Sequence, residues 1–144
     1  MKKLISGFVA LFSLLLLANC STQSKVPENI KRDWMLVEFQ NFNRELMVNS
    51  KAHLSLIDEN NDPGKFSANM GCNNMFGQAT FNSSGIVKFS EIGSTMMYCD
   101  QSMDLETAFA KDLPKMTQYK VEGHYLTLTA PSGERMKFVA SDWD

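Results

Sequence analysis

Two cysteines, Cys72 and Cys99, are the side chains of this sequence that are best suited to covalent chemistry. The third cysteine, Cys20, ends the N-terminal leader described below, and setting it aside leaves an even number. Thiols exposed in an oxidising compartment are oxidised, so an even number favours a disulfide. A bond between these two would stabilise a small domain by roughly 3–4 kcal/mol, because it constrains the unfolded chain. The alternative is two buried free thiols that pack as small hydrophobic side chains. Geometry decides between them, so both stay open at this point.

Methionines gather near both cysteines and indicate a second kind of chemistry. Soft sulfur ligands select copper(I), so a copper(I)-binding or redox-handling periplasmic protein is an alternative function. Against it, Met70 alternates with Phe66 and Ala68 as a buried strand position does, and methionine commonly fills gaps in a core. Core packing is therefore the simpler interpretation, and we expect no metal site and no cofactor. The sulfur-bearing residues of the two stretches are Met70, Cys72, Met75, Met96, Met97, Cys99 and Met103.

Glycine and asparagine surround Cys72, at Gly71, Asn73, Asn74 and Gly77. Such residues fit tight turns and left-handed backbone positions, where side-chain amides bond to nearby backbone groups. We therefore expect a structural turn. The functional alternative is a polar binding corner formed by Gly71, Asn73 and Asn74.

The sequence lacks the motifs of the common catalytic sites. His53 and His124 occur without a second histidine or a glutamate at metal-binding spacing. Neither a Gly-x-Ser-x-Gly elbow nor a phosphate-binding glycine loop is present. We expect no enzymatic activity and assign no catalytic residue.

Residues 1–19 are typical of a secretory signal peptide. Two lysines precede an uncharged apolar stretch that is shorter than the roughly 20 residues a membrane-spanning helix needs. The end of this leader, Leu17-Ala18-Asn19-Cys20, resembles the bacterial lipobox, which implies that Cys20 is lipidated and becomes the first residue of the mature chain.

The residues after the leader extend this interpretation. By resemblance to sorted lipoproteins, Ser21 implies an anchor in the outer membrane of a two-membrane bacterium, with the domain facing the periplasm. Residues 20–32 are polar and would form a lipidated tether. The alternative is a soluble periplasmic protein that is cleaved nearby.

Composition and charge exclude several classes of protein. The 144 residues are 44% hydrophobic and 21% charged, as in an ordinary globular protein, and this length suits one domain. The formal charge of −2 provides no basic surface for nucleic acid. We expect a monomer whose partners are the membrane, through the lipid, and an unidentified envelope protein or small ligand.

Strands must position most of these side chains, since apolar residues alternate with polar ones over much of residues 33–140. Turn residues separate the strands at residues 60–64, 82–85, 122–124 and 131–133. The opening strand is apolar on both faces, at residues 34–37 and 39. The other alternating apolar positions are Leu54, Leu56, Phe66, Ala68, Met70, Ala79, Phe81, Val87, Phe89, Leu126, Leu128, Met136 and Phe138.

One segment departs from this two-residue period. Over residues 102–113 the apolar side chains of Leu105, Phe109 and Leu113 recur every four positions, which predicts a helix capped by Ser102 and ended by Pro114. Seven or eight short strands and one helix predict a mainly β domain over residues 33–140, followed by a tail over 141–144. The expected architecture is a curved antiparallel sheet or small barrel with the helix packed on it.

Three sequence blocks and the C-terminal strands carry a resemblance to a known family. They are Trp34-x-Leu36, Met70-Gly71-Cys72-Asn73-Asn74-Met75-Phe76-Gly77, Thr95-Met96-Met97-Tyr98-Cys99 followed by Glu106, Phe109 and Leu113, and then Tyr119, Val121, Gly123, Leu126 and Leu128. In this order they resemble the META domain family of HslJ-like heat-shock lipoproteins. The resemblance implies a small β-rich envelope domain, often lipid-anchored, that is linked to heat stress and to novobiocin tolerance and has no established catalytic activity. We therefore expect a non-enzymatic binding or interaction module.

Overall fold

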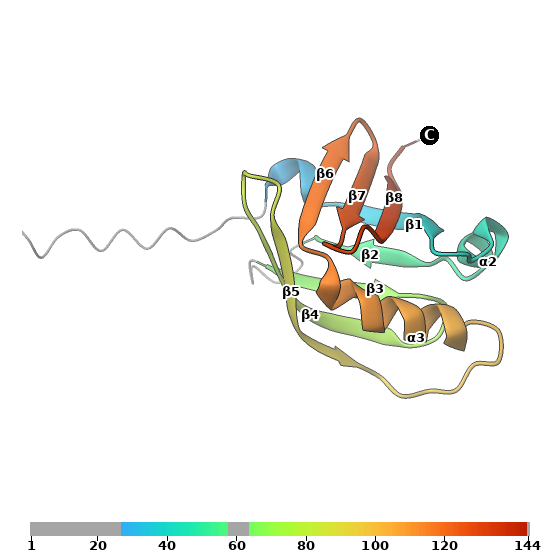
Figure 1. Cartoon of the computed structure of the whole chain (residues 1–144). Coiled ribbons are helices and arrows are strands. Elements are labelled where there is room, and N and C mark those ends of the chain that lie inside the picture. Colours follow the sequence, from blue (N-terminus) through green and yellow to red (C-terminus); the bar gives the residue numbers. More distant parts are fainter. Residues whose placement is uncertain (1–26, 58–63, 144) are drawn as a thin grey trace, which may run out of the picture.

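Alternating apolar side chains fold into eight antiparallel strands that form one sheet, curled into a half-barrel (Figure 1). The computed structural model describes residues 27–57 and 64–143. The expected signal peptide, the lipidation site Cys20 and most of the tether lie outside the described residues. Within the described part of the chain, no helix is long and apolar enough to cross a membrane.

Two meanders share this sheet. The first contains β1 (Asp33–Phe39), β2 (His53–Ser55), β3 (Lys65–Asn69), β4 (Asn74–Phe81) and β5 (Val87–Ser94), and the second contains β6 (Gln118–Glu122), β7 (Tyr125–Thr129) and β8 (Arg135–Ala140). The strand order is β5-β4-β3-β2-β1-β8-β7-β6, so the pairing of β1 with β8 joins the two meanders. The predicted fold class, with eight strands and a helix packed on the sheet, is confirmed.

The inner face of the sheet carries the core that the alternation predicts. Every alternating position expected in strands β2–β8 and at their ends is buried. On β1, which is apolar on both faces, the fully buried side chains are those of Trp34, Leu36 and Phe39. Phe39 breaks the two-residue period because a β-bulge between Leu36 and Glu38 shifts the register against β8 and turns Phe39 inward.

The two edge strands meet at one end of the half-barrel. Ile86 bridges Gln118 in antiparallel fashion, and the Tyr119 amide donates to the Gly85 carbonyl at 2.8 Å. The Tyr119 hydroxyl also donates to the Asn82 carbonyl at 2.6 Å, in the turn between β4 and β5. These contacts pair part of each edge and leave the rest of the half-barrel open.

The helix α3 (Met103–Asp112) connects the two meanders and packs on the sheet (Figure 1). Leu105, Phe109 and Leu113 are fully buried, as their four-residue spacing predicts. The α-helix continues as a 3-10 turn, η3 (Leu113–Lys115), that contains Pro114. Ser102 occupies the N-cap position, but contrary to the prediction its side chain makes no capping hydrogen bond.

A second short helix, α2 (Arg44–Asn49), lies in a segment that has no clear pattern in the sequence. The side chain of Asn43 caps it by accepting a hydrogen bond from the Glu45 amide at 2.8 Å. Met47 is its one buried residue. Leu46 is partly buried against the core, and these two neighbouring side chains in a helix of 6 residues produce no periodicity from which α2 could be predicted.

The folded part of the chain is longer than residues 33–140. Ile30, which the prediction assigned to the tether, is the last residue of the 3-10 turn η2 (Glu28–Ile30). It is fully buried, and its carbonyl accepts a hydrogen bond from the Trp34 indole at 2.8 Å. At the other end, the Ser141 amide donates to the Asp33 carbonyl at 2.9 Å, and Trp143 stacks on His124. Both predicted boundaries are therefore too narrow.

Asp112, at the end of α3, makes the fold sensitive to pH. Its buried carboxylate accepts a hydrogen bond from Gln40 Nε2 at 2.6 Å and pairs with Lys115 Nζ at 2.5 Å. The hydrogen bond from Lys115 holds the pKa of the Asp112 carboxyl below its usual value. Burial acts in the opposite direction, and the hydrogen bond from Gln40 and the positive charges of Lys115 and Lys111 add to the lowering. A carboxyl whose pKa is lowered by folding stabilises the native state at neutral pH, and this stabilisation is lost as the pH falls through the folded-state pKa.

We predict that Asp112→Asn lowers the free energy of unfolding by about 1–2 kcal/mol at pH 7, because it weakens two hydrogen bonds to a charged group. The difference from the unchanged protein should shrink at about pH 3, where the carboxyl of Asp112 is largely protonated in the unfolded chain. Urea unfolding at the two pH values measures both effects. Glu45→Gln, at an exposed carboxylate on α2, is the control. An equal difference at both pH values would contradict the prediction.

Candidate functional site

Cys72 and Cys99 are joined in a disulfide, with 5.9 Å between their Cα atoms and a sequence separation of 27. The predicted bond is confirmed, and the alternative of two free thiols is wrong. The disulfide fastens the turn between β3 and β4 to the segment that leads from β5 to α3. In Figure 1 this segment runs along the outside of the molecule before it enters the helix.

A buried carboxylate lies close to this disulfide. Glu106 on α3 is 6% exposed. Its Oε2 accepts a hydrogen bond from the Asn73 backbone amide at 2.7 Å, and its Oε1 accepts one from the Asn73 side-chain amide at 2.6 Å. A carboxylate is costly to bury unless donors satisfy it, so this pair fixes α3 against the turn that contains Cys72.

The side chain of Asn73 also holds the segment after β5. Its Oδ1 accepts hydrogen bonds from the Met97 amide at 2.7 Å and from the Thr95 hydroxyl at 2.9 Å. Its Nδ2 donates to the Met97 carbonyl at 2.9 Å as well as to Glu106. One asparagine side chain thus contacts the backbone of Met97 as a strand neighbour would, although residues 95–101 belong to no strand.

The predicted polar corner at Gly71, Asn73 and Asn74 is used by the protein itself. Asn73 is buried and fully engaged, while the exposed Asn74 accepts a hydrogen bond from the Asn69 side chain at 2.8 Å. Only Gly71 has the left-handed conformation expected of this group, with φ +111 and a hypothetical Cβ 2.7 Å from the Cβ of Ser50. Neither asparagine has a positive φ, so the expectation of left-handed backbone is wrong for both. The structural interpretation is therefore favoured.

Three consecutive apolar side chains project from the segment after β5, which Asn73 and the disulfide hold in place. Met96, Met97 and Tyr98, called the apolar tip below, are 97%, 58% and 82% exposed. Phe76 is also exposed, on the outer side of β4, with its ring lying over Gly93. Single exposed apolar residues are ordinary, but three in a row on a fixed backbone are typical of an interaction site.

The sulfur-bearing residues of the two methionine-rich stretches lie in different surroundings. Both cysteines are bonded to each other, and Met70 and Met75 are buried in the core, whereas Met96 points into solvent. Over residues 27–57 and 64–143, no cluster of three or more His, Cys, Asp or Glu side chains could hold a metal ion. This arrangement does not favour the copper(I) alternative.

The two histidines take no part in the hydrogen bonds of the Asn73 side chain. His53 Nδ1 lies 2.9 Å from the Lys51 carbonyl, and His124 stacks on Trp143 with 4.8 Å between the ring centroids.

Glu106 and Thr95 are the functional residues that sequence reasoning missed. The available signal was an acidic residue at position 106, which lies on the same helix face as Phe109 and Leu113. A carboxylate on an otherwise apolar helix face requires a buried donor. Nothing in the sequence identifies that donor as Asn73.

We predict that Asn73→Ala lowers the free energy of unfolding by about 2–3 kcal/mol, because it removes the side-chain donor to Glu106 Oε1 and the acceptor of the Met97 amide, while the backbone amide at position 73 still bonds to Oε2. Asn74→Ala, which changes the same residue type at an exposed neighbouring position, should cost less than about 1 kcal/mol. Chemical denaturation of the three proteins measures the difference. Equal losses in the two variants would show that the Asn73 network does not stabilise the fold.

We predict that replacing both Cys72 and Cys99 by serine lowers the free energy of unfolding by about 3–4 kcal/mol, because the unfolded chain gains entropy. Amide hydrogen exchange should accelerate most at residues 95–98, which lose one of their two attachments. Adding a reductant should reproduce both effects in the unchanged protein and have none in the double variant. A uniform acceleration of amide exchange over all strands, without a larger effect at residues 95–98, would show that the disulfide does not hold this segment locally.

The molecule is similar to solved structures of low sequence identity. The NMR structure of a protein from Burkholderia xenovorans superposes with a TM-score of 0.67 at 18% identity, covering 78% of this chain and 83% of that one. The crystal structure of a DUF4847 family protein from Bacteroides vulgatus gives a TM-score of 0.55 at 12% identity, covering 81% and 97%. At these identities the likeness shows the fold alone. No curated protein sequence matches this chain.

The family model of the META domain matches residues 28–143. This range begins at η2 and ends at Trp143, in agreement with the packing of both ends of the folded part. It includes the disulfide, the Asn73–Glu106 pair and the apolar tip. The chain therefore belongs to the META domain family.

Proposed function

We propose that this protein is a non-enzymatic, envelope-anchored interaction module that docks onto another envelope protein through the apolar tip. The observation that carries the proposal is that the tip is both exposed and fixed. Met96 and Tyr98 project almost fully into solvent. The backbone between them is held by two hydrogen bonds, one from the Met97 amide to Asn73 Oδ1 and one from Asn73 Nδ2 to the Met97 carbonyl, and Cys99, which follows Tyr98, forms the disulfide.

A fixed apolar tip favours binding for two reasons. Ordering a flexible loop on association costs free energy, and a loop that the free protein already orders avoids most of that cost. Methionine adapts its shape to a partner surface, and tyrosine is among the residues most often important at the centre of interfaces. The Asn73–Glu106 pair and the disulfide therefore support the tip, and the tip makes the contact.

Membership of the META domain family supports an envelope-associated domain. We further propose that Cys20 carries a lipid anchor in the outer membrane and that the domain acts as a monomer in the periplasm. A second acyl chain makes such attachment stable, since one chain alone is marginal. Heat tolerance and novobiocin tolerance would then depend on the partner that the tip binds.

The test places a photo-crosslinking phenylalanine derivative at position 98 in living cells. We predict an adduct with one envelope protein, identified by mass spectrometry, and about tenfold weaker binding of the purified partner when Met96→Ser removes an apolar contact. The same variant should reduce growth at high temperature and in novobiocin.

Val48 provides the matched control, since it is an exposed apolar residue on a different element, α2. A crosslinker at position 48 should give no adduct with that partner, and Val48→Ser should leave binding unchanged. Equal adducts from positions 48 and 98, or none from position 98, would refute docking through the tip.

A further inference from the structure

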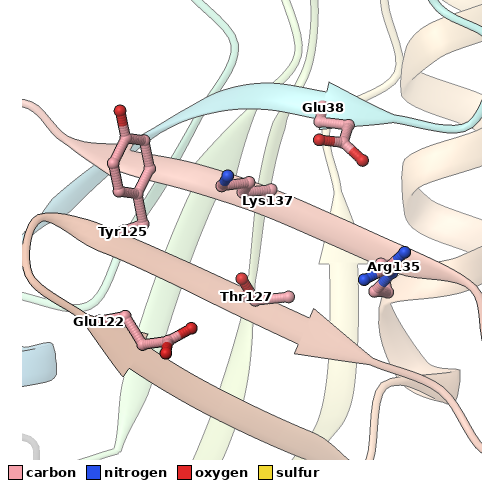
Figure 2. A pocket seen from close by; sticks show the side chains of 6 residues that line it. All are labelled: Glu38, Glu122, Tyr125, Thr127, Arg135 and Lys137. Atoms are coloured by element: carbon pink, nitrogen blue, oxygen red, sulfur yellow. The ribbon is translucent and has the colours of Figure 1, made fainter.

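A shallow groove of about 250 Å³ crosses the outer face of the sheet on strands β1, β8, β7 and β6. Figure 2 shows Arg135 and Lys137 on one strand and Tyr125 and Thr127 on its neighbour, between Glu38 on β1 and Glu122 on β6. These six residues are called the outer groove below. The outer groove shares no residue with the apolar tip.

Strand register places these side chains in rows. Glu38 lies opposite Lys137, and Lys137 lies opposite Thr127, so a carboxylate, an ammonium and a hydroxyl form one row across three strands. Arg135 stands two residues before Lys137 on the same face of β8. The alternate residues Met136 and Phe138 are fully buried, and this burial holds the strand and the row of polar side chains in place.

The cations of the outer groove have acidic neighbours, Glu38 and Glu122, but among the described residues they form no salt bridge with them. Within the described residues, neither Arg135 nor Lys137 forms an ion pair within 4.0 Å, whereas Glu122 pairs with Lys120 at 2.7 Å. The Lys137 ammonium instead lies 4.6 Å from the centroid of the Tyr125 ring. Two adjacent cations whose charged groups are in no salt bridge can bind an anionic group of a ligand.

Aromatic rings extend the outer groove at one end. Tyr125 contacts Trp143 with 5.9 Å between the ring centroids, and Trp143 stacks on His124 at 4.8 Å. Tyr125 and Trp143 remain 36% and 46% exposed. An exposed indole beside a tyrosine presents an apolar surface with polar edges, on which the CH groups of a sugar ring can pack.

The dimensions of the outer groove favour an extended ligand. Tyr125 lies opposite Val139, which is four residues beyond Arg135 on β8. At a rise of about 3.4 Å per residue, the aromatic end and Arg135 are roughly 13 Å apart. This separation exceeds one sugar ring, so a ligand that contacts both ends must contain at least two rings.

We propose that the outer groove binds an acidic oligosaccharide, that is, a sugar chain with carboxylate or phosphate groups. Arg135 and Lys137 bind the anionic group, Tyr125 and Trp143 pack on a sugar ring, and Thr127 and Glu38 hydrogen-bond to hydroxyls. A neutral sugar would leave both cations without a partner, and a simple anion would leave the aromatic surface uncovered. The site is independent of docking at the apolar tip.

The two tryptophans provide the measurement. Trp34 is fully buried and donates to the Ile30 carbonyl, while Trp143 is exposed beside the outer groove. In a ¹H–¹⁵N spectrum of the full chain, kept in lauryldimethylamine oxide because this detergent has no sugar or phosphate group, each indole gives one signal. Trigalacturonic acid and the phosphorylated disaccharide trehalose 6-phosphate are titrated separately, with maltotriose and trehalose as their neutral counterparts.

We predict that at least one acidic sugar shifts the Trp143 indole signal and the amides of β7 and β8 saturably, with the Trp34 signal unchanged. The neutral counterpart should bind at least about tenfold more weakly, as expected for the loss of a charge-assisted contact. The acidic sugar that binds distinguishes carboxylate from phosphate recognition. Arg135→Gln should weaken binding about tenfold, whereas Arg44→Gln, at an exposed arginine on α2, should not.

Other outcomes would overturn the proposal. Equal shifts with inorganic phosphate would show a simple anion site, and stronger shifts with a triglutamate peptide would show a site for an acidic protein segment. Equal binding of neutral and acidic sugars would remove the role of the two cations. No saturable shift with either acidic sugar would refute the site. Met96→Ser should leave sugar binding unchanged, which separates this test from that of the apolar tip.

Discussion

The architecture depends on how one buried carboxylate is satisfied. Glu106 lies on the inward side of α3, where a charge is costly, and Asn73 supplies both of its hydrogen-bond donors. The same asparagine uses its remaining hydrogen-bonding capacity on Thr95 and Met97. The hydrogen bonds of this one residue therefore position three separate parts of the chain: the helix, the turn after β3 and the segment after β5. The disulfide connects two of these parts covalently, so each attachment supports the other.

Sequence alone was sufficient for the strands and for α3, because one face of each is buried and the burial leaves a period in the sequence. The sequence did not predict the features whose buried residues show no regular period. The β-bulge in β1 turns Phe39 inward against the alternation, and α2 packs through two adjacent residues, Leu46 and Met47, which show no helical period. The two ends of the folded part were missed for the same reason, since Ile30 is a single apolar residue in a polar stretch.

The candidate site was predictable only in part. The sequence contains three cysteines, and the pairing of Cys72 with Cys99 follows once Cys20 is set aside as the predicted lipidation site. The contact between Asn73 and Glu106 joins residues 33 positions apart, and no local pattern indicates it. The outer groove is less visible still, because its polar side chains are ordinary outward residues of amphipathic strands. Its character comes from register, which places Glu38, Lys137 and Thr127 side by side.

The pairing of β1 with β8 brings the first and last strands of the sheet together. During synthesis, which proceeds from the N-terminus, the five-strand meander can form early. One side of β1, however, has no neighbouring strand until residues 135–140 have been made. Contacts between such distant parts of a sequence form slowly, since a long loop must close before they contribute. Completion of the sheet thus waits for the final segment, and a chain shortened at its C-terminus would expose an unpaired strand next to the core.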